Sequence, residues 1–169
     1  AGFEVLIYAR HPEKVRDLVS EGFKLYGTIK ELVQDSEIVI TIVGFPSDVR
    51  EVYFDEDKII NNAKPGTILL DMTTSSPTLA QEIHQKAKER NIHSLDCPVT
   101  GGDLGARNGT LTIFVGGDHD IYEKVLPVLK AMGTTIAYVG GPGSGQHAKL
   151  ANQIAIAGAI SGVAEAVAY

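Results

Sequence analysis

The sequence has no tryptophan and only one cysteine, Cys97, among its 169 residues. A single thiol cannot form an internal disulfide or a multi-thiolate zinc site, and such cysteine usage favours a reducing compartment, so we expect a cytoplasmic protein. The five histidines are scattered without a metal-ligand spacing, which predicts no bound metal. The sequence also lacks a Gly-x-Ser-x-Gly elbow, and Cys97 follows an acid rather than cations that would activate its thiol.

Basic residues are in deficit, with 15 Lys and Arg against 21 Asp and Glu and a formal net charge of −6. Without a basic surplus to neutralise phosphates, the charge disfavours nucleic acid and acidic membrane surfaces as partners. The most apolar run, residues 154–164, is shorter than the roughly 20 residues that a bilayer requires, so we expect no membrane span. The 44% hydrophobic and 21% charged residues are typical of a soluble globular domain.

Both ends of the sequence are abrupt. The chain begins with alanine and no signal sequence follows. The last predicted helix reaches the final residue without a glycine or proline stop after Gly162. We therefore expect truncation at both ends. The Pro/Gly-rich segment 140–145 is the best internal boundary, which separates residues 1–142 from residues 143–169.

Strand-like and helix-like patterns alternate along the chain. Runs of β-branched and aromatic residues predict strands, and apolar residues at helical spacing predict helices. The predicted strands are residues 3–9, 37–43, 67–71, 92–96, 111–115 and 134–139. The predicted helices are residues 12–21, one that begins at Ser47, and residues 77–90, 118–132 and 146–169. Short connections in this order predict an α/β fold with a doubly wound, Rossmann-type, mostly parallel sheet that ends in a long helix.

The longest segment that follows a strand is residues 96–110 (DCPVTGGDLGARNGT). Ligands of such sheets bind beyond the carboxyl ends of the strands. Thr100 offers a hydroxyl, and Gly101 and Gly102 allow backbone amides to approach a carboxylate or phosphate. A tight turn that needs glycine only for its backbone angles is the alternative, but the added threonine and the length of the motif favour binding.

Residues 143–153 (GSGQHAKLANQ) open the last predicted helix, where Ser144 is placed to cap. Lys149, Asn152 and Gln153 then share one helix face. A lysine near a helix start opposes the macrodipole, and the positive helix end lowers its pKa, which suits a proton donor that works near neutrality. A solvated lysine beside two incidental amides is the alternative.

Arg10 follows the first predicted strand, which ends at Ala9. In a dinucleotide-binding fold the end of the second strand faces the adenosine ribose, where an acid selects NAD and an arginine accommodates the extra phosphate of NADP. No acid stands at this position, so Arg10 favours NADP, with NAD the less favoured coenzyme. An exposed arginine in a turn is the alternative.

Three motifs in order resemble the β-hydroxyacid dehydrogenase family, which includes 3-hydroxyisobutyrate dehydrogenase and tartronate semialdehyde reductase. They are DCPVTGG at 96–102, GTL at 109–111, and a Gly-x-Gly at 143–145 followed by KLANQ at 149–153. The resemblance covers nearly the whole chain. It implies an NAD(P)-dependent oxidoreductase that transfers a hydride between a nicotinamide coenzyme and a short hydroxy acid or semialdehyde acid. A non-catalytic dinucleotide-binding module of the same fold is the alternative.

The resemblance also implies roles for single residues. Lys149 matches the catalytic lysine, Asn152 matches the substrate-binding asparagine, and the substrate loop corresponds to Thr100, Gly101 and Gly102. Together with Arg10, the expected coenzyme contacts are Phe45, Pro46, Arg50 and Thr74. The presence of a lysine favours a carbonyl over an imine substrate.

Two features of the family do not occur in this sequence. One is the opening strand with its glycine-rich pyrophosphate turn, so residues 1–142 resemble an incomplete dinucleotide-binding domain. The other is the all-helical domain into which the family's last helix continues, so residues 143–169 resemble the start of an interdomain helix and of that domain. The resemblance implies that the complete protein is a homo-oligomer built through the helical domain, and that these 169 residues alone are inactive.

Overall fold

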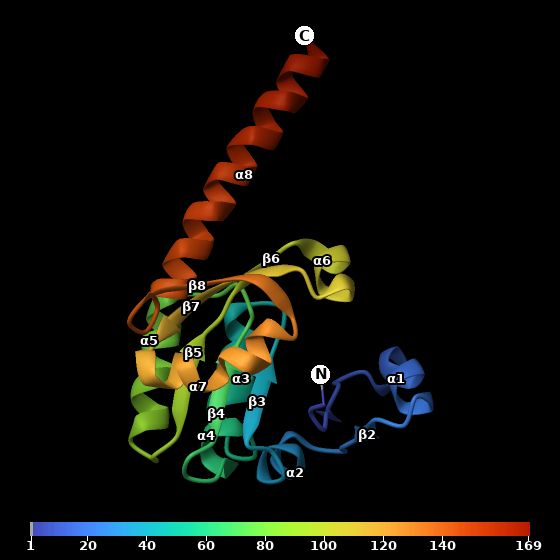
Figure 1. The fold of residues 1–169 in the computed structure, drawn as a ribbon, viewed down its shortest axis with the longest axis vertical. Helices are drawn as coiled ribbons and strands as arrows, with labels where there is room; N and C mark the ends of the chain where they lie inside the picture. The colour runs from blue at the N-terminus through green and yellow to red at the C-terminus, as the bar shows by residue number, and fades with distance from the viewer. Residues whose placement is uncertain (1) are drawn as a thin grey trace.

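A six-stranded sheet forms the centre of the computed structural model, which describes residues 2–169 (Figure 1). Its strand order is β3 (Ile38–Thr41), β4 (Ile68–Asp71), β5 (His93–Asp96), β7 (Leu111–Gly117) and β6 (Val99–Thr100), and β8 (Gly133–Gly140) also pairs with β7. Strands β3, β4 and β5 are mutually parallel, as are β7 and β8. The sheet is therefore mostly parallel, as predicted.

The exceptions to the parallel pattern are β7, which runs antiparallel to both β5 and β6, and β8, which runs in the direction of β7. No long crossover helix joins β5, β6 and β7. Instead β6 follows directly after β5, and the chain reverses through the short helix α6 (Gly102–Asn108) before β7. Parallel neighbours need a crossover of a dozen or more residues, so this short connection produces a hairpin. The sequence patterns did not predict β6 or α6.

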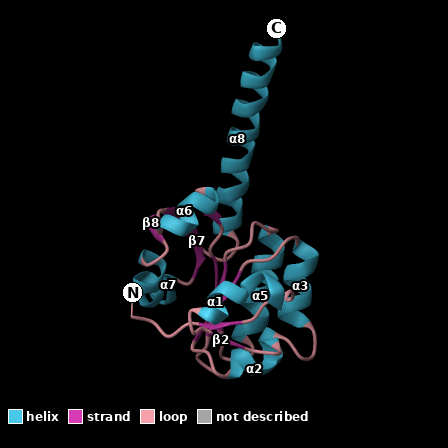
Figure 2. Ribbon diagram, turned by 90° about the vertical axis from the view of Figure 1, so that its right-hand side faces the viewer, coloured by secondary structure: helices cyan, strands magenta, loops and turns pink. Residues whose placement is uncertain are grey.

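Helices cover both faces of the sheet (Figure 2). Leu69 and Leu70 are successive residues of β4, both fully buried, and they belong to different core clusters. Leu69 shares its cluster with residues of α2 (Ile29–Gln34), α3 (Pro46–Phe54), α4 (Ile59–Asn62) and α5 (Pro77–Lys88). Leu70 shares its cluster with residues of α7 (His119–Lys130). Because successive strand side chains point to opposite faces, the two clusters confirm the doubly wound arrangement.

The N-terminal segment lies beside the central sheet rather than within it (Figure 1). Strand β1 (Leu6–Ile7) pairs with β2 (Lys24–Leu25) in a separate two-stranded sheet. The strand predicted over residues 3–9 is thus only two residues long. The helix predicted over residues 12–21 is divided into η1 (Pro12–Val15) and α1 (Arg16–Ser20). Among residues 2–169, β3 has no strand on its outer edge, where Ile40 is 42% exposed.

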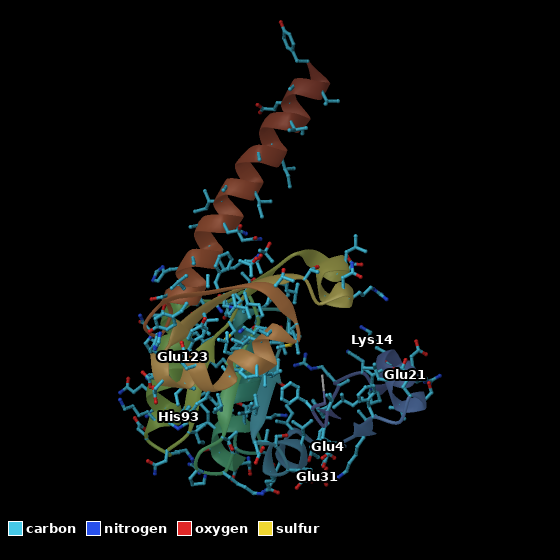
Figure 3. All side chains as sticks on the ribbon, viewed as in Figure 1. Glu4, Lys14, Glu21, Glu31, His93 and Glu123 are labelled. Atoms are coloured by element: carbon cyan, nitrogen blue, oxygen red, sulfur yellow. The ribbon has the colours of Figure 1, made fainter. Side chains whose placement is uncertain are left out.

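The last helix, α8 (Ser144–Ala168), confirms the predicted long C-terminal helix. One face of its first two turns, with Gly145, Gln146 and Lys149, is buried, whereas its outer turns and their side chains project away from the domain (Figure 3). Its length and composition would be sufficient to cross a membrane, a criterion that helices of soluble proteins also meet. The prediction that no segment is long enough to span a membrane, which was made from residues 154–164, is therefore wrong.

Gly145 allows α8 to begin in direct contact with the sheet. A Cβ atom at this position would lie 2.6 Å from the carbonyl oxygen of Asp96 and 2.9 Å from that of Phe114. These are backbone atoms of β5 and β7, which cannot rotate away as a flexible side chain could. The close approach of helix and sheet therefore requires glycine here.

Gly145→Ala should destabilise the chain by about 1–3 kcal/mol, the usual cost of inserting a methyl group where no space exists. Gly158→Ala on the same helix is the matched control, because a Cβ there would meet nothing within 4 Å. That control should be neutral or stabilise by up to about 1 kcal/mol through helix propensity. Urea unfolding of the three proteins measures the difference, and equal stabilities of the two variants would contradict the packing described.

Candidate functional site

The buried carboxylate of Asp96, at the carboxyl end of β5, holds the start of α8. Its Oδ1 accepts a hydrogen bond from the Gly143 N–H at 2.8 Å, and its Oδ2 accepts one from the Gln146 N–H at 2.8 Å. These donors belong to the helix start, where N–H groups lack acceptors within the helix and where negative charge is favoured. Burial raises the pKa of Asp96 against the effect of these donors.

The predicted cap at Ser144 is wrong. The N-cap residue is Gly143, with φ 86°, and no side chain of the cap residue accepts a hydrogen bond from the helix. The side-chain acceptor comes instead from Asp96, 50 residues before Gln146 in the chain. A capping pattern read from neighbouring residues cannot reveal an acceptor that another strand supplies.

Gln146 links α8 to the loop between β4 and α5. Its side chain is fully buried. The Nε2 atom donates to the Thr73 carbonyl at 2.7 Å, and Oε1 accepts from the Ser75 N–H at 2.8 Å. The two bonded peptide groups lie on either side of Thr74, whose own side chain is exposed. Gln146 therefore fixes the loop that presents one of the predicted coenzyme contacts.

A second buried carboxyl, Asp71, ties together the ends of β3 and β4. Its Oδ1 accepts from the Thr41 hydroxyl at 3.0 Å and from the Thr73 N–H at 3.1 Å. The Thr73 hydroxyl in turn accepts from the Val43 N–H at 3.0 Å. Burial raises the pKa of Asp71 to about 6, despite these hydrogen bonds.

Lys149 is buried, with 6% of its surface exposed, which excludes the alternative of a solvated lysine. It lies one turn after Gln146 on the same side of α8. Burial lowers the pKa of its ammonium group below the ordinary value. The sequence predicted this direction from the helix dipole, whereas desolvation is the cause that the structure gives. Asn152, one turn further on, is half-buried and donates to the Gln153 side chain at 3.3 Å.

The predicted substrate loop lies at the turn from β6 into α6. Thr100 pairs with Thr112 of β7, and α6 stands away from the start of α8 in Figure 1. Gly101 and Gly102 have φ values of 128° and 63°, in the left-handed region that favours glycine. Backbone angle alone thus accounts for both glycines. Both are exposed, and their part in binding stays a prediction.

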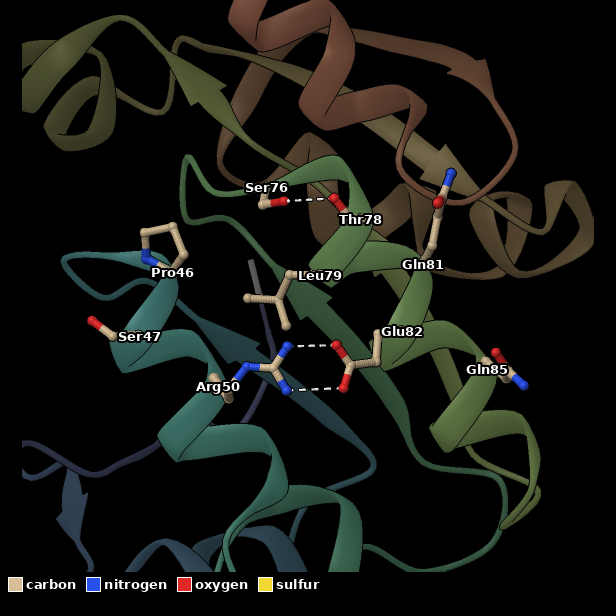
Figure 4. A pocket seen from close by; sticks show the side chains of 9 residues that line it. All are labelled: Pro46, Ser47, Arg50, Ser76, Thr78, Leu79, Gln81, Glu82 and Gln85. Atoms are coloured by element: carbon tan, nitrogen blue, oxygen red, sulfur yellow. Dashed lines mark hydrogen bonds and ion pairs between the residues drawn. The ribbon is translucent and has the colours of Figure 1, made fainter.

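Two of the predicted coenzyme contacts, Pro46 and Arg50, line a groove of about 700 Å³ between α3 and α5 (Figure 4). Arg50 forms two hydrogen bonds with Glu82 of α5, at 2.9 and 2.5 Å. Phe45, at the start of α3, is 72% exposed. The Arg50 guanidinium thus joins the two helices, and its contact with a coenzyme stays a prediction.

Arg10 is exposed and lies against the first turns of α3. Its guanidinium pairs with Glu51 at 3.2 Å and with Asp48 at 3.6 Å. Exposed pairs of this kind contribute only about 0.2–1 kcal/mol, so they would not prevent the guanidinium from turning to a phosphate. Its role in coenzyme choice stays a prediction.

The residues that organise the site were not predicted to do so. They are four residues, Asp71, Thr73, Asp96 and Gln146, and the Thr73 N–H donates to Asp71. A signal for the two acids existed, because each is the last residue of a predicted strand in a sheet that helices cover on both faces, where burial is expected. Gln146 had no such signal, since its partners are more than 70 residues away in the chain.

Fold and site together define a class. A doubly wound sheet, polar groups at the carboxyl ends of its parallel strands and a helix that begins above them are features of α/β domains that bind nucleotide coenzymes. Residues 1–140 match the family described as the NAD binding domain of 6-phosphogluconate dehydrogenase. The chain belongs to this family, which confirms the resemblance to the β-hydroxyacid dehydrogenases.

Relatives in this family carry names of related enzymes. The chain is 51% identical over 168 residues to "Uncharacterized oxidoreductase YkwC" of Bacillus subtilis, which spans 99% of this chain and 58% of the relative. It is 46% identical to "Probable 3-hydroxyisobutyrate dehydrogenase-like 3, mitochondrial" of Arabidopsis thaliana, over 100% of this chain and 53% of the relative. It is 38% identical to "NAD-dependent L-serine dehydrogenase" of Pseudomonas aeruginosa, over 99% of this chain and 56% of the relative.

Solved structures show the same fold. The 3-hydroxyisobutyrate dehydrogenase of Mycobacterium tuberculosis with L-serine has a TM-score of 0.91 at 33% identity, over 98% of this chain and 56% of that one. A structure described as Psf3 in complex with NADP+ and 2-OPP has a TM-score of 0.87 at 26% identity, over 97% of this chain and 60% of that one. The chain thus spans between about half and three fifths of these proteins.

Asp71→Asn tests the buried carboxyl of Asp71. The folded pKa of about 6 exceeds the ordinary value of 3.8, so the folded state binds the proton more tightly. The free energy of unfolding should therefore fall as the pH rises from about 4 to about 6, by roughly 3 kcal/mol from this group. Asparagine can still accept at Oδ1 but does not titrate, so the variant should lack this fall.

Urea unfolding at pH 4 and pH 7 provides the measurement. Asp103→Asn, an exposed aspartate of α6, is the control that should keep the pH dependence of the unchanged chain. If Asp71→Asn kept that dependence as well, the Asp71 carboxyl would not have a raised pKa.

Proposed function

We propose that the complete protein is an NAD(P)-dependent oxidoreductase that acts on a short hydroxy acid or semialdehyde acid of the 3-hydroxyisobutyrate or tartronate semialdehyde type. The observation that carries this proposal is the buried Lys149, at the start of α8. The carboxyl ends of β4 and β5 meet α8 at this point. The family and the names of the relatives support the same class of reaction.

The described residues fit a nicotinamide coenzyme at this edge of the sheet. Thr74 is exposed between two peptide groups that Gln146 holds, and Phe45 and Pro46 present an exposed apolar surface at the start of α3. When bound, the coenzyme supplies the hydride chemistry. We propose NADP as the coenzyme, with NAD less favoured, because β1 is followed by Arg10 and not by an acidic residue. The similar proteins include one named for NAD and one bound to NADP+.

Lys149 is the proposed general acid and base. As an ammonium group it donates its proton to the carbonyl oxygen during reduction, and it takes the proton back during oxidation. Burial lowers its pKa, which moves the group toward the pH at which such transfer is efficient. In water-exposed surroundings the same lysine would hold its proton more tightly.

Thr100, Gly101, Gly102 and Asn152 are the proposed substrate contacts. Gly101 and Gly102 are exposed, and their N–H groups suit a carboxylate because no side chain at either position would cover them. The Asn152 amide lies one turn after Lys149 and can orient the reacting oxygen or the carboxylate. Holding the acid in this way converts binding into orientation of the reacting carbon.

The exposed outer part of α8 supports a further proposal about assembly. Ile154, Ile160 and Val163 are between 65% and 75% exposed. We propose that a helical domain beyond α8 covers them in the complete cytoplasmic protein and forms a homo-oligomer. The helix would then bridge the two domains.

Lys149→Ala, in a full-length protein that contains this sequence, should lower kcat by about 10²–10⁴, the usual range for loss of a general acid or base. The Kd for NADPH should stay nearly unchanged. The assay is loss of reduced-nicotinamide absorbance with methylmalonate, tartronate and succinate semialdehydes and glyoxylate. Lys130→Ala, an exposed lysine of α7, is the control and should keep full turnover. Near-normal turnover of Lys149→Ala would refute the proposed role.

Arg10→Asp should weaken NADPH binding by about 10- to 100-fold, the loss expected for one hydrogen bond between charged groups. NADH binding should change little, because NADH lacks the ribose phosphate. Fluorescence titration of both coenzymes measures the ratio. Arg16→Asp, at an exposed arginine of α1, makes the same charge change and should leave the ratio as it was. An unchanged ratio in Arg10→Asp would leave Arg10 as a turn residue.

A further inference from the structure

Gln146 is the one fully buried side-chain amide among residues 2–169, and the proposed chemistry gives it no part. A glutamine is costly to bury unless its amide is satisfied. Here Nε2 donates to the Thr73 carbonyl and Oε1 accepts from the Ser75 N–H, at 2.7 and 2.8 Å. A single side chain thus bonds the peptide groups on both sides of Thr74.

The Gln146 bridge restrains the rotation of α8 about its own axis, which the Asp96 cap leaves open. The cap bonds backbone N–H groups near the helix axis, so it fixes where α8 begins. Gln146 reaches outward from the axis to a loop of another element, so it also fixes the rotation of the helix. Because the Lys149 ammonium lies several ångströms from the axis, a rotation of about 10° would move it by on the order of 1 Å.

We infer that Gln146 is a positioning residue, which holds Lys149 in register with the Thr74 loop. The inference rests on the proposed function, in which Lys149 donates the proton and Thr74 lies beside the nicotinamide. A displacement of 1 Å at a reacting group can cost about 10² in rate, so this register matters for the chemical step. Coenzyme affinity, which many other contacts determine, should depend on it little.

Gln146→Met tests the inference, because methionine has a similar length and volume but cannot form either hydrogen bond. In a full-length protein that contains this sequence, the single-turnover rate of hydride transfer should fall by about 10- to 100-fold. Comparison of NADPH with its 4-deuterated form establishes that hydride transfer is the step observed. The Kd for NADPH, measured by fluorescence titration, should stay within about twofold, as expected for a group remote from most coenzyme contacts.

Hydrogen exchange provides a readout that does not need turnover. The Ser75 amide should exchange faster in Gln146→Met, since its acceptor is lost. Gln146→Glu keeps the acceptor for Ser75 but loses the donor to Thr73, so it should preserve that protection and slow hydride transfer less. It also serves if the methionine variant fails to fold. Val125→Ala, which truncates a fully buried side chain of α7, is the control for lost stability and should leave the hydride-transfer rate unchanged.

Two outcomes separate the inference from the function on which it rests. If Gln146→Met, or the glutamate variant in its place, transfers hydride at the unchanged rate while Lys149→Ala is inactive, Gln146 is only structural and the inference is wrong. If Lys149→Ala is itself fully active, the proposed function fails first. A slower hydride transfer in the Gln146 variants, with unchanged coenzyme affinity and an unchanged rate in Val125→Ala, supports the inference.

Discussion

Asp96 places a negative charge and two hydrogen-bond acceptors under the first turn of α8. This contact fixes where that helix begins on the sheet. Gly116 and Gly145 make it geometrically feasible, since a Cβ on Gly116 would lie 2.6 Å from the Gly145 nitrogen. With helix and sheet this close, Lys149 becomes buried without an acidic partner among residues 2–169, and its pKa falls. The lowered pKa supports the proposed role of Lys149 in proton transfer.

Stability and chemistry compete at the carboxyl ends of the strands. Asp71 and Asp96 stand opposite each other in adjacent strands, and burial raises the pKa of both. A hydrophobic pair would pack there without this cost. The carboxyls remain because their hydrogen bonds order the loops after β3, β4 and the start of α8. Such perturbed groups gather where a fold organises a functional site.

The sequence predicted the alternation of strands and helices, the doubly wound sheet and the long last helix, because each depends on local periodicity. The direction of the Lys149 pKa was also predicted, but from the helix dipole rather than from the burial that lowers it. It did not predict the antiparallel β7 or the short β1, since strand direction and length depend on available partners. It also missed the Asp96 cap and the Gln146 bridge, whose bonds join residues 47 to 73 positions apart. Interactions between such distant residues leave no periodic pattern.

The central claim is that the Asp96-anchored start of α8 presents Lys149 to a substrate beside a nicotinamide coenzyme. A crystal structure of the complete protein with coenzyme and a short hydroxy acid bound tests it most directly. The account predicts that Lys149 Nζ lies about 2.6–3.2 Å from the hydroxyl oxygen of the acid, within reach for proton transfer. A bound acid whose reacting oxygen lies far from Nζ, with another side chain in that place, would contradict it.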